Sequence, residues 1–252
     1  MGLHNQPIHR VADHLKHAAL ANFLAARDCA ADIVAAADMI SAAFQQGGTL
    51  LLCGNGGSAA DCQHLAAEFT SRLSADFVRP GLPAIALTTD TSFLTAHAND
   101  FDFEGVFARQ VQALGKPGDV LLAISTSGRS KNVVQAAEMA KEMRLKVIAL
   151  TGSCGSGTNC DGTAANDATP PSPPLRRGGN KAPSFEPAAI AGVDAAGSGR
   201  VPLLRLADVA ICVPSVNPQH IQEAHLAVEH ILCHLVERAL FSQSPCSQSR
   251  RS

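Results

Sequence analysis

The sequence predicts an α/β fold, in which a doubly wound, mainly parallel sheet of five strands is flanked by helices and preceded by an N-terminal helical hairpin. Three observations predict this fold. Short apolar runs recur along the chain, they are mostly apolar on both faces, and stretches of helical length separate several of them. Strands that are buried on both faces are typical of parallel sheets, and their alternation with helices is typical of doubly wound folds.

The first 47 residues predict the helical hairpin. They are rich in alanine, and apolar residues recur three and four positions apart over 11–19. A second such run covers 30–44, and a pair of glycines at 47–48 follows it. This spacing is typical of amphipathic helices, and the glycines are expected to end the second one.

The remaining elements are read from the apolar runs and from the stretches between them. The five expected strands are 49–53, 84–88, 120–125, 147–151 and 209–213. The three expected helices between strands are 59–73, 104–114 and 131–143. Gly- and Ser-rich turns separate the strands from the helices, as the fold requires.

One long segment, 153–200, has no apolar periodicity. It holds six of the fourteen prolines and eight of the twenty glycines. Such a composition is typical of chain that forms no packed core, so we expect a disordered insertion between the fourth and fifth strands. The sequence therefore predicts one domain over 48–152 and 201–241, with a flexible tail at 242–252.

Composition excludes several classes of function. The formal net charge is −2, and the chain has neither Trp nor Tyr. A nucleic-acid-binding surface normally shows a basic excess or stacking aromatic residues, so we expect no nucleic-acid partner. No apolar run reaches the length of a membrane span, and the polar N-terminus shows no secretory signal. We therefore expect a cytoplasmic protein without a membrane partner.

Two glycine- and serine-rich turns follow predicted strands. The first is CGNGGSAAD at 53–61, and the second is STSGRS at 125–130. Carboxyl ends of parallel strands meet at one edge of the sheet, where such folds bind ligands. Glycines allow a close approach of the backbone, and hydroxyls and free N–H groups at a helix start suit phosphate oxygens. Neither turn has the G-K-[ST] of a P-loop.

Histidine and carboxylate side chains recur at helical spacing in two places. His64 and Glu68 lie four residues apart, so they share one face of the helix after the first turn. The last helix carries Gln222, His230 and His234 among apolar positions. His64 and Glu68 offer nitrogen and oxygen ligands for a divalent metal, and spacing alone leaves open whether His230 or His234 joins them.

Five ordered motifs carry a resemblance to a known family. They are CGNGGSAADCQH, the AND of 98–100, PGDVLLAISTSG, ALTG and IQEAH-x4-H. Over about 30–152 and 203–241, the chain resembles the phosphoheptose isomerases of the SIS (sugar isomerase) family. The resemblance implies an SIS-type domain and one zinc ion per subunit.

The family's functional residues fall on matching positions of this chain. The resemblance implies His64, Glu68, Gln222 and His230 as zinc ligands, which selects His230 over His234. It also implies Glu68 as the catalytic base and His230 as the acid. The implied substrate contacts are Asn55, Gly56, Gly57, Glu68, Asn99, Asp100, Ser125, Thr126, Ser127, Ser130 and Gln222.

The activity implied by the resemblance is conversion of sedoheptulose 7-phosphate to D-glycero-D-manno-heptose 7-phosphate through a metal-assisted enediol. This product is a precursor of lipopolysaccharide heptose. The resemblance also implies a homotetramer with active sites at subunit interfaces. The alternative is a non-catalytic SIS protein that binds the replication initiator as a tetramer. The presence of both Glu68 and His230 favours the isomerase, because that relative lacks the matching ligands.

Three features depart from the family pattern. Gln219 stands where an acidic residue is common, Arg129 replaces the usual Asn of the second turn, and the insertion at 153–200 is foreign to the pattern. The first two affect the expected substrate contacts, and the third affects packing between subunits.

Overall fold

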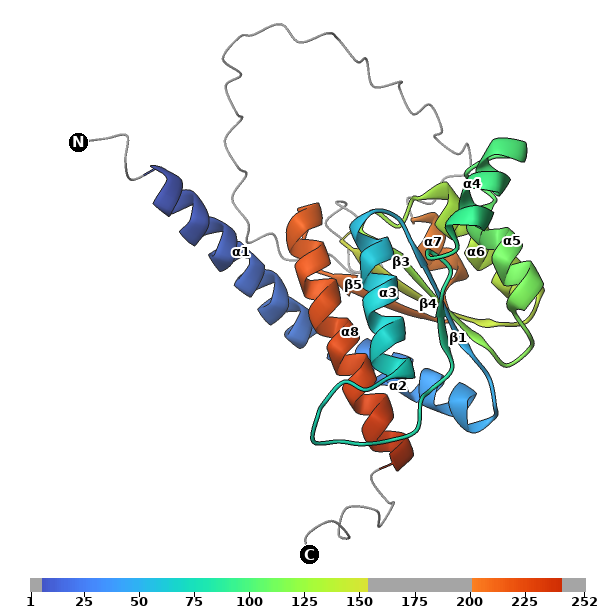
Figure 1. Ribbon diagram of the computed structural model, residues 1–252. Helices are drawn as coiled ribbons and strands as arrows, with labels where there is room; N and C mark the ends of the chain where they lie inside the picture. The colour runs from blue at the N-terminus through green and yellow to red at the C-terminus, as the bar shows by residue number, and fades with distance from the viewer. Residues whose placement is uncertain (1–5, 154–200, 242–252) are drawn as a thin grey trace, which may run out of the picture.

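The computed structural model describes residues 6–153 and 201–241. The expected tail, and the expected insertion beyond its first residue, lie outside the described residues. Five parallel strands form one sheet in the order β2-β1-β3-β4-β5 (Figure 1). The strands are β1 (Leu50–Gly54), β2 (Ala84–Ala86), β3 (Val120–Ser125), β4 (Lys146–Gly152) and β5 (Val209–Val213). The expected parallel α/β sheet is confirmed.

The strand order fixes where the sheet can bind a ligand. The chain moves from β1 to β2 on one side, and then crosses to β3 on the other side of β1. The reversal opens a crevice between the carboxyl ends of β1 and β3, which is the usual ligand site of doubly wound sheets. The first glycine- and serine-rich turn follows β1, and the second follows β3.

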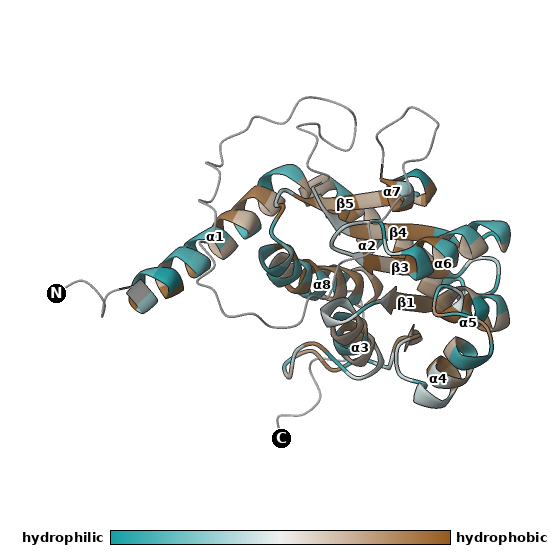
Figure 2. Cartoon of the chain, turned by 90° about the horizontal axis from the view of Figure 1, so that it is seen from above, coloured by the Kyte–Doolittle hydropathy of each residue, from teal (hydrophilic) through white to brown (hydrophobic). Residues whose placement is uncertain are grey.

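Helices cover both faces of the sheet (Figure 2). Successive strand residues point to opposite faces, so Leu50 and Leu52 belong to one apolar core and Leu51 belongs to the other. The first core is completed by α2 (Ala30–Gln45), α3 (Gly57–Thr70) and α8 (Pro218–Phe241). The second is completed by α4 (Thr91–Asp100), α5 (Val106–Leu114), α6 (Lys131–Glu142) and α7 (Pro202–Leu206).

Two of these helices, α4 and α7, were not expected from the sequence. Helix α4 has no fully buried residue, and no continuous apolar face in its sequence marks it as a helix. Its start is instead fixed by Asp90, whose side chain accepts a hydrogen bond of 2.9 Å from the backbone N–H of Phe93. Helix α7 has five residues, which is too short to show a helical period.

The two expected N-terminal helices are present, but they do not form a hairpin. Helix α1 (Gln6–Asp28) meets α2 at a bend at Cys29, and it leads away from the body instead of folding back along α2 (Figure 1). Its contacts with the domain include His14, which meets Glu223 of α8, and Ala21, which packs against the start of α8. No helix among the described residues, α1 included, is both long and apolar enough to cross a membrane.

A buried ion pair fastens the end of α3 to α8. Arg79 Nε donates to Glu237 Oε1 over 2.7 Å, and both side chains are inaccessible to solvent. The same guanidinium donates to the backbone carbonyls of Glu68 and Phe69, each over 2.7 Å. Since these carbonyls lie in the last turn of α3, the cation also complements the helix dipole. Arg79 therefore fixes the helix end that carries Glu68.

We expect Arg79→Met to destabilise the fold strongly. The variant leaves the Glu237 carboxylate buried without its cation, which typically costs about 3–5 kcal/mol. The double variant Arg79→Met/Glu237→Leu removes both charges and should recover part of the loss. Urea unfolding, followed by circular dichroism, measures both effects.

The matched control is Lys141→Met, which breaks the exposed pair between Lys141 and Asp208. This change should cost about 0–1 kcal/mol. If Arg79→Met lowered the free energy of unfolding by no more than this, the buried ion pair would not be what holds α3 against α8.

Candidate active site

The first turn joins β1 directly to α3. Gly57 opens the helix, and a Cβ built at this position would collide with the carboxamide of Gln222. The glycine thus allows α8 to bring Gln222 against the turn. Asn55 and Gly56 complete the connection, and the backbone of Gly56 has a φ of 55°, which favours glycine.

The second turn is organised by its own hydroxyls. Ser125 Oγ lies 3.0 Å from Ser130 Oγ and accepts from the backbone N–H of Gly128 over 3.1 Å. Ser127 Oγ accepts from the N–H of Arg129 over 3.2 Å. Ser130 is the N-cap of α6, so the free N–H groups of the helix start lie beside these hydroxyls. Ser125 is buried, Thr126 and Ser130 are half-buried, and Ser127 is exposed.

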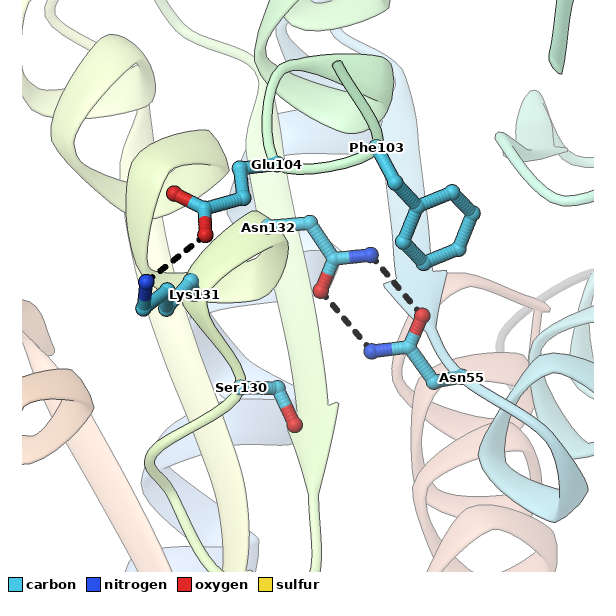
Figure 3. A pocket seen from close by; sticks show the side chains of 6 residues that line it. All are labelled: Asn55, Phe103, Glu104, Ser130, Lys131 and Asn132. Atoms are coloured by element: carbon cyan, nitrogen blue, oxygen red, sulfur yellow. Dashed lines mark hydrogen bonds and ion pairs between the residues drawn. The ribbon is translucent and has the colours of Figure 1, made fainter. Parts of the chain in front are cut away.

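A pocket of about 300 Å³ lies between the two turns (Figure 3). On one side, Asn55 and Asn132 exchange two side-chain hydrogen bonds of 2.8 Å. On the other, Lys131 Nζ donates to Glu104 Oε1 over 2.7 Å, and this contact raises the pKa of the lysine. The pocket is lined by Asn55, Phe103, Glu104, Ser130, Lys131 and Asn132. It therefore joins one expected site residue from each turn.

Sequence reasoning missed Asn132. The side chain is buried in the first turn of α6, where it ties the second turn to Asn55 of the first. The available signal was a polar residue two positions after the N-cap Ser130, in the first turn of the helix. Spacing along the sequence does not connect residues 55 and 132, so only the sheet order could reveal the pair.

Helices α3 and α8 lie side by side (Figures 1 and 2). Their side chains bring three expected metal ligands together. The Nε2 atoms of His64 and His230 are 2.8 Å apart, and His64 Nε2 lies 3.8 Å from Glu68 Oε1. Glu68 Oε2 is buried and has no hydrogen-bond partner among the described residues. A cation would supply the missing partner, and imidazole nitrogens with a carboxylate suit a divalent ion such as zinc. These residues therefore fit a metal.

Gln222 lies two helical turns before His230 on α8. Its Nε2 atom donates to Asp61 Oδ2 over 3.3 Å, which leaves the amide oxygen as the free acceptor. Asp61 was not among the residues expected from the sequence. It lies one turn before His64 on α3, and its carboxylate orients the Gln222 amide.

Two buried carboxyl groups lie behind these ligands. Burial raises the pKa of Asp61 to about 6, although the Gln222 hydrogen bond opposes the shift. Burial also raises the pKa of Glu229 to about 9, and the nearby Asp61 carboxylate adds to this effect. Burial thus favours the neutral form of Glu229, which reduces the repulsion between the two carboxyl groups.

Other expected residues lie apart from this centre. Asn99 and Asp100 are exposed at the end of α4, where Asn99 Nδ2 donates to Asp100 Oδ1 over 2.9 Å. Within the described residues, neither side chain forms a hydrogen bond with the two turns. Gln219 and Arg129, the two departures from the family pattern, are exposed. His234 is exposed one turn beyond His230 on α8.

Comparisons with known proteins agree with this architecture. The model of the SIS domain family matches residues 16–152. A phosphoheptose isomerase from Roseiflexus is 43% identical over 84% of this chain and 83% of the relative. One from Thiobacillus denitrificans is 42% identical over 93% of this chain and 97% of the relative.

Two solved structures are also similar. The phosphoheptose isomerase GmhA from Neisseria gonorrhoeae superposes with a TM-score of 0.69 and 34% identity, over 92% of this chain and 98% of that one. The phosphoheptose isomerase from Francisella tularensis gives a TM-score of 0.70 and 30% identity, over 92% and 99% of the two chains. Sequence, fold and the paired turns thus agree, and the chain belongs to the phosphoheptose isomerase family of SIS-domain enzymes.

Proposed function

We propose that this chain interconverts sedoheptulose 7-phosphate and D-glycero-D-manno-heptose 7-phosphate. The observation that carries the proposal is the meeting of His64, Glu68 and His230 on α3 and α8, where α3 begins at the first glycine-rich turn. The relatives from Roseiflexus and Thiobacillus denitrificans are named phosphoheptose isomerases, which supports this substrate class. On this proposal, the product supplies the heptose of lipopolysaccharide and the reaction takes place in the cytoplasm.

The proposed cofactor is one zinc ion per subunit, held by His64, Glu68, Gln222 and His230. The buried, unpartnered Glu68 Oε2 and the free amide oxygen of Gln222 support this ligand set. When bound, the ion polarises substrate oxygens and stabilises the negative charge that develops on them.

Glu68 is the proposed base. Its carboxylate removes the proton from C1 of the ketose, which gives an enediol, and returns that proton to C2 to form the aldose. His230 is the proposed acid, which moves the proton between the two oxygens. Arg79 holds the backbone carbonyl of Glu68 through its guanidinium, so the base is carried by a fixed helix end.

The substrate phosphate is proposed to bind at the second turn. Ser125, Thr126, Ser127 and Ser130 provide hydroxyls there, and the start of α6 provides free backbone N–H groups. The pocket between the turns would then hold the sugar chain, with Asn55, Gly56 and Gly57 on its other side. Arg129 is exposed within this turn and adds positive charge.

A homotetramer with active sites at subunit interfaces is part of the proposal. Large apolar side chains on α1 are exposed in the single chain, among them Ile8, Leu15 and Phe23. Asn99 and Asp100, expected to contact substrate, are exposed next to the apolar Phe101. A second copy that covers these surfaces would bury the apolar faces and would bring the end of α4 to a neighbouring site.

An isomerase assay on sedoheptulose 7-phosphate, with metal analysis of the same preparation, tests the proposal. Turnover that depends on bound zinc would support it. A zinc-loaded tetramer without turnover would overturn it and would favour the non-catalytic, partner-binding alternative.

Glu68→Gln should abolish most of the turnover and leave substrate binding intact. The amide keeps the size and one oxygen ligand but removes the base, which typically costs roughly 10²–10⁴-fold in rate. Steady-state kinetics, calorimetric binding of the sugar phosphate and metal analysis give the three readouts. Glu142→Gln, which changes an exposed acid on α6, is the matched control. Near-normal turnover of a zinc-loaded Glu68→Gln variant would show that another group is the base.

His230→Ala should lose turnover and the zinc ion of the proposed active site, whereas His234→Ala should retain both. His230 Nε2 faces His64, while His234 is exposed one turn farther along the same helix. Metal content and activity of the two variants, purified in parallel, provide the comparison. The ligand assignment on α8 is wrong by one turn if His234→Ala proves the more damaging change.

Ser127→Asp should nearly abolish substrate binding, and Ser127→Ala should raise KM. The aspartate places a negative charge where the phosphate is proposed to bind, while the alanine removes only one hydroxyl. Gln112→Glu, which adds a charge on α5 instead, should leave KM unchanged. Equal affinity of the Ser127→Asp variant and the parent protein would locate the phosphate elsewhere.

A further inference from the structure

A second cluster of potential metal ligands lies where α1 meets the start of α8, away from the site described above. His14 comes from α1, and His220 and Glu223 come from α8. One ligand atom from each of the three residues lies within 4.8 Å of those from the other two. On α8, His220 and Glu223 contact α1, whereas Gln222 contacts Gly57 and Asp61 of α3.

The contacts within this cluster are short. His14 Nε2 lies 2.7 Å from Glu223 Oε1, and the His14 and His220 rings meet edge to face with centroids 4.7 Å apart. A third imidazole, His17, stands 5.7 Å from His220, centroid to centroid. His14 and His17 are three residues apart, as are His220 and Glu223, so each helix presents a pair of polar side chains on one face.

One buried nitrogen atom of the cluster has no hydrogen-bond partner among the described residues. This atom is Nε2 of His220, a residue that is 7% exposed. A buried polar atom left without a partner costs about 1–3 kcal/mol, so a ligand for it is favoured. A purely hydrogen-bonded cluster would account for His14 and Glu223 but not for this nitrogen.

We propose that His14, His220 and Glu223 form a second divalent-metal site, which links α1 to α8. Two imidazoles and a carboxylate suit zinc, and the same donors accept cobalt or nickel. The exposure of Glu223 leaves room for water or His17 as a further ligand. The ion would tie the projecting helix α1 to the domain, so its role is structural and separate from the proposed catalysis.

Equilibrium dialysis of the full-length chain against zinc chloride, followed by metal analysis, tests the proposal. The measurements are made in the His230→Ala background, which removes the proposed active-site ion. The His230→Ala protein should still bind zinc, and adding His14→Ala should weaken that binding about tenfold or more, since loss of a residue that only orients a metal ligand commonly costs about 10–100-fold. Adding His9→Ala, which removes an exposed histidine of the same helix, should leave the affinity unchanged.

Thermal unfolding of the same proteins gives a readout that is independent of activity. Zinc should raise the Tm of His230→Ala and of His9→Ala/His230→Ala, and it should not raise the Tm of His14→Ala/His230→Ala. Equal zinc affinity with and without His14, or no zinc binding by His230→Ala, would overturn the proposed site. An inactive parent protein that still loses a zinc ion on His14→Ala would contradict only the proposed isomerase function.

Discussion

The packing of α3 against α8 is the constraint on which the rest of the site depends. Both helices lie over the same face of the sheet. Their contacts follow in order, from Gly57 and Asp61 with Gln222, through His64 with His230, to Glu237, which Arg79 joins to the last turn of α3. Each contact fixes the next, because a shift of one helix by a turn would separate all of them by about 5.4 Å. The buried Arg79 closes the series and prevents such a shift at the end that carries Glu68.

The sheet contributes a separate constraint, the strand order. Because β1 and β3 are neighbours although β2 lies between them in sequence, the two glycine- and serine-rich turns lie on either side of one pocket. The first turn also opens α3, so the helix that carries His64 and Glu68 starts at the edge of that pocket. The two constraints therefore meet at Gly57, where the absence of a side chain admits Gln222. A larger residue there would push α8 away from both the turn and the ligands.

Sequence reasoning succeeded where the signal is local and failed where it depends on pairing across the fold. Sequence reasoning predicted the buried strands, the two turns and the shared helix face of His64 and Glu68, because each of these patterns lies within one short segment of the chain. Helix α4 was missed because it buries no complete apolar face, and the direction of α1 was misjudged because a bend at Cys29 replaces the expected loop. Asp61 and Asn132 could not be identified, since their partners Gln222 and Asn55 are 161 and 77 residues away.

The exposed face of α1 sets a requirement for the assembly. Ile8, Val11, Leu15 and Phe23 are each about two-thirds exposed, and covering them would contribute roughly 4–8 kcal/mol at 1.5–3 kcal/mol for each full burial. Association of two proteins costs about 4–15 kcal/mol, so one such face offsets the lower part of that range but not the upper part. In a symmetric contact between two copies, each copy buries this face of α1, so the free energy gained from burial is twice that of one face. A second copy of α1 would supply such a face, as the proposed homotetramer requires.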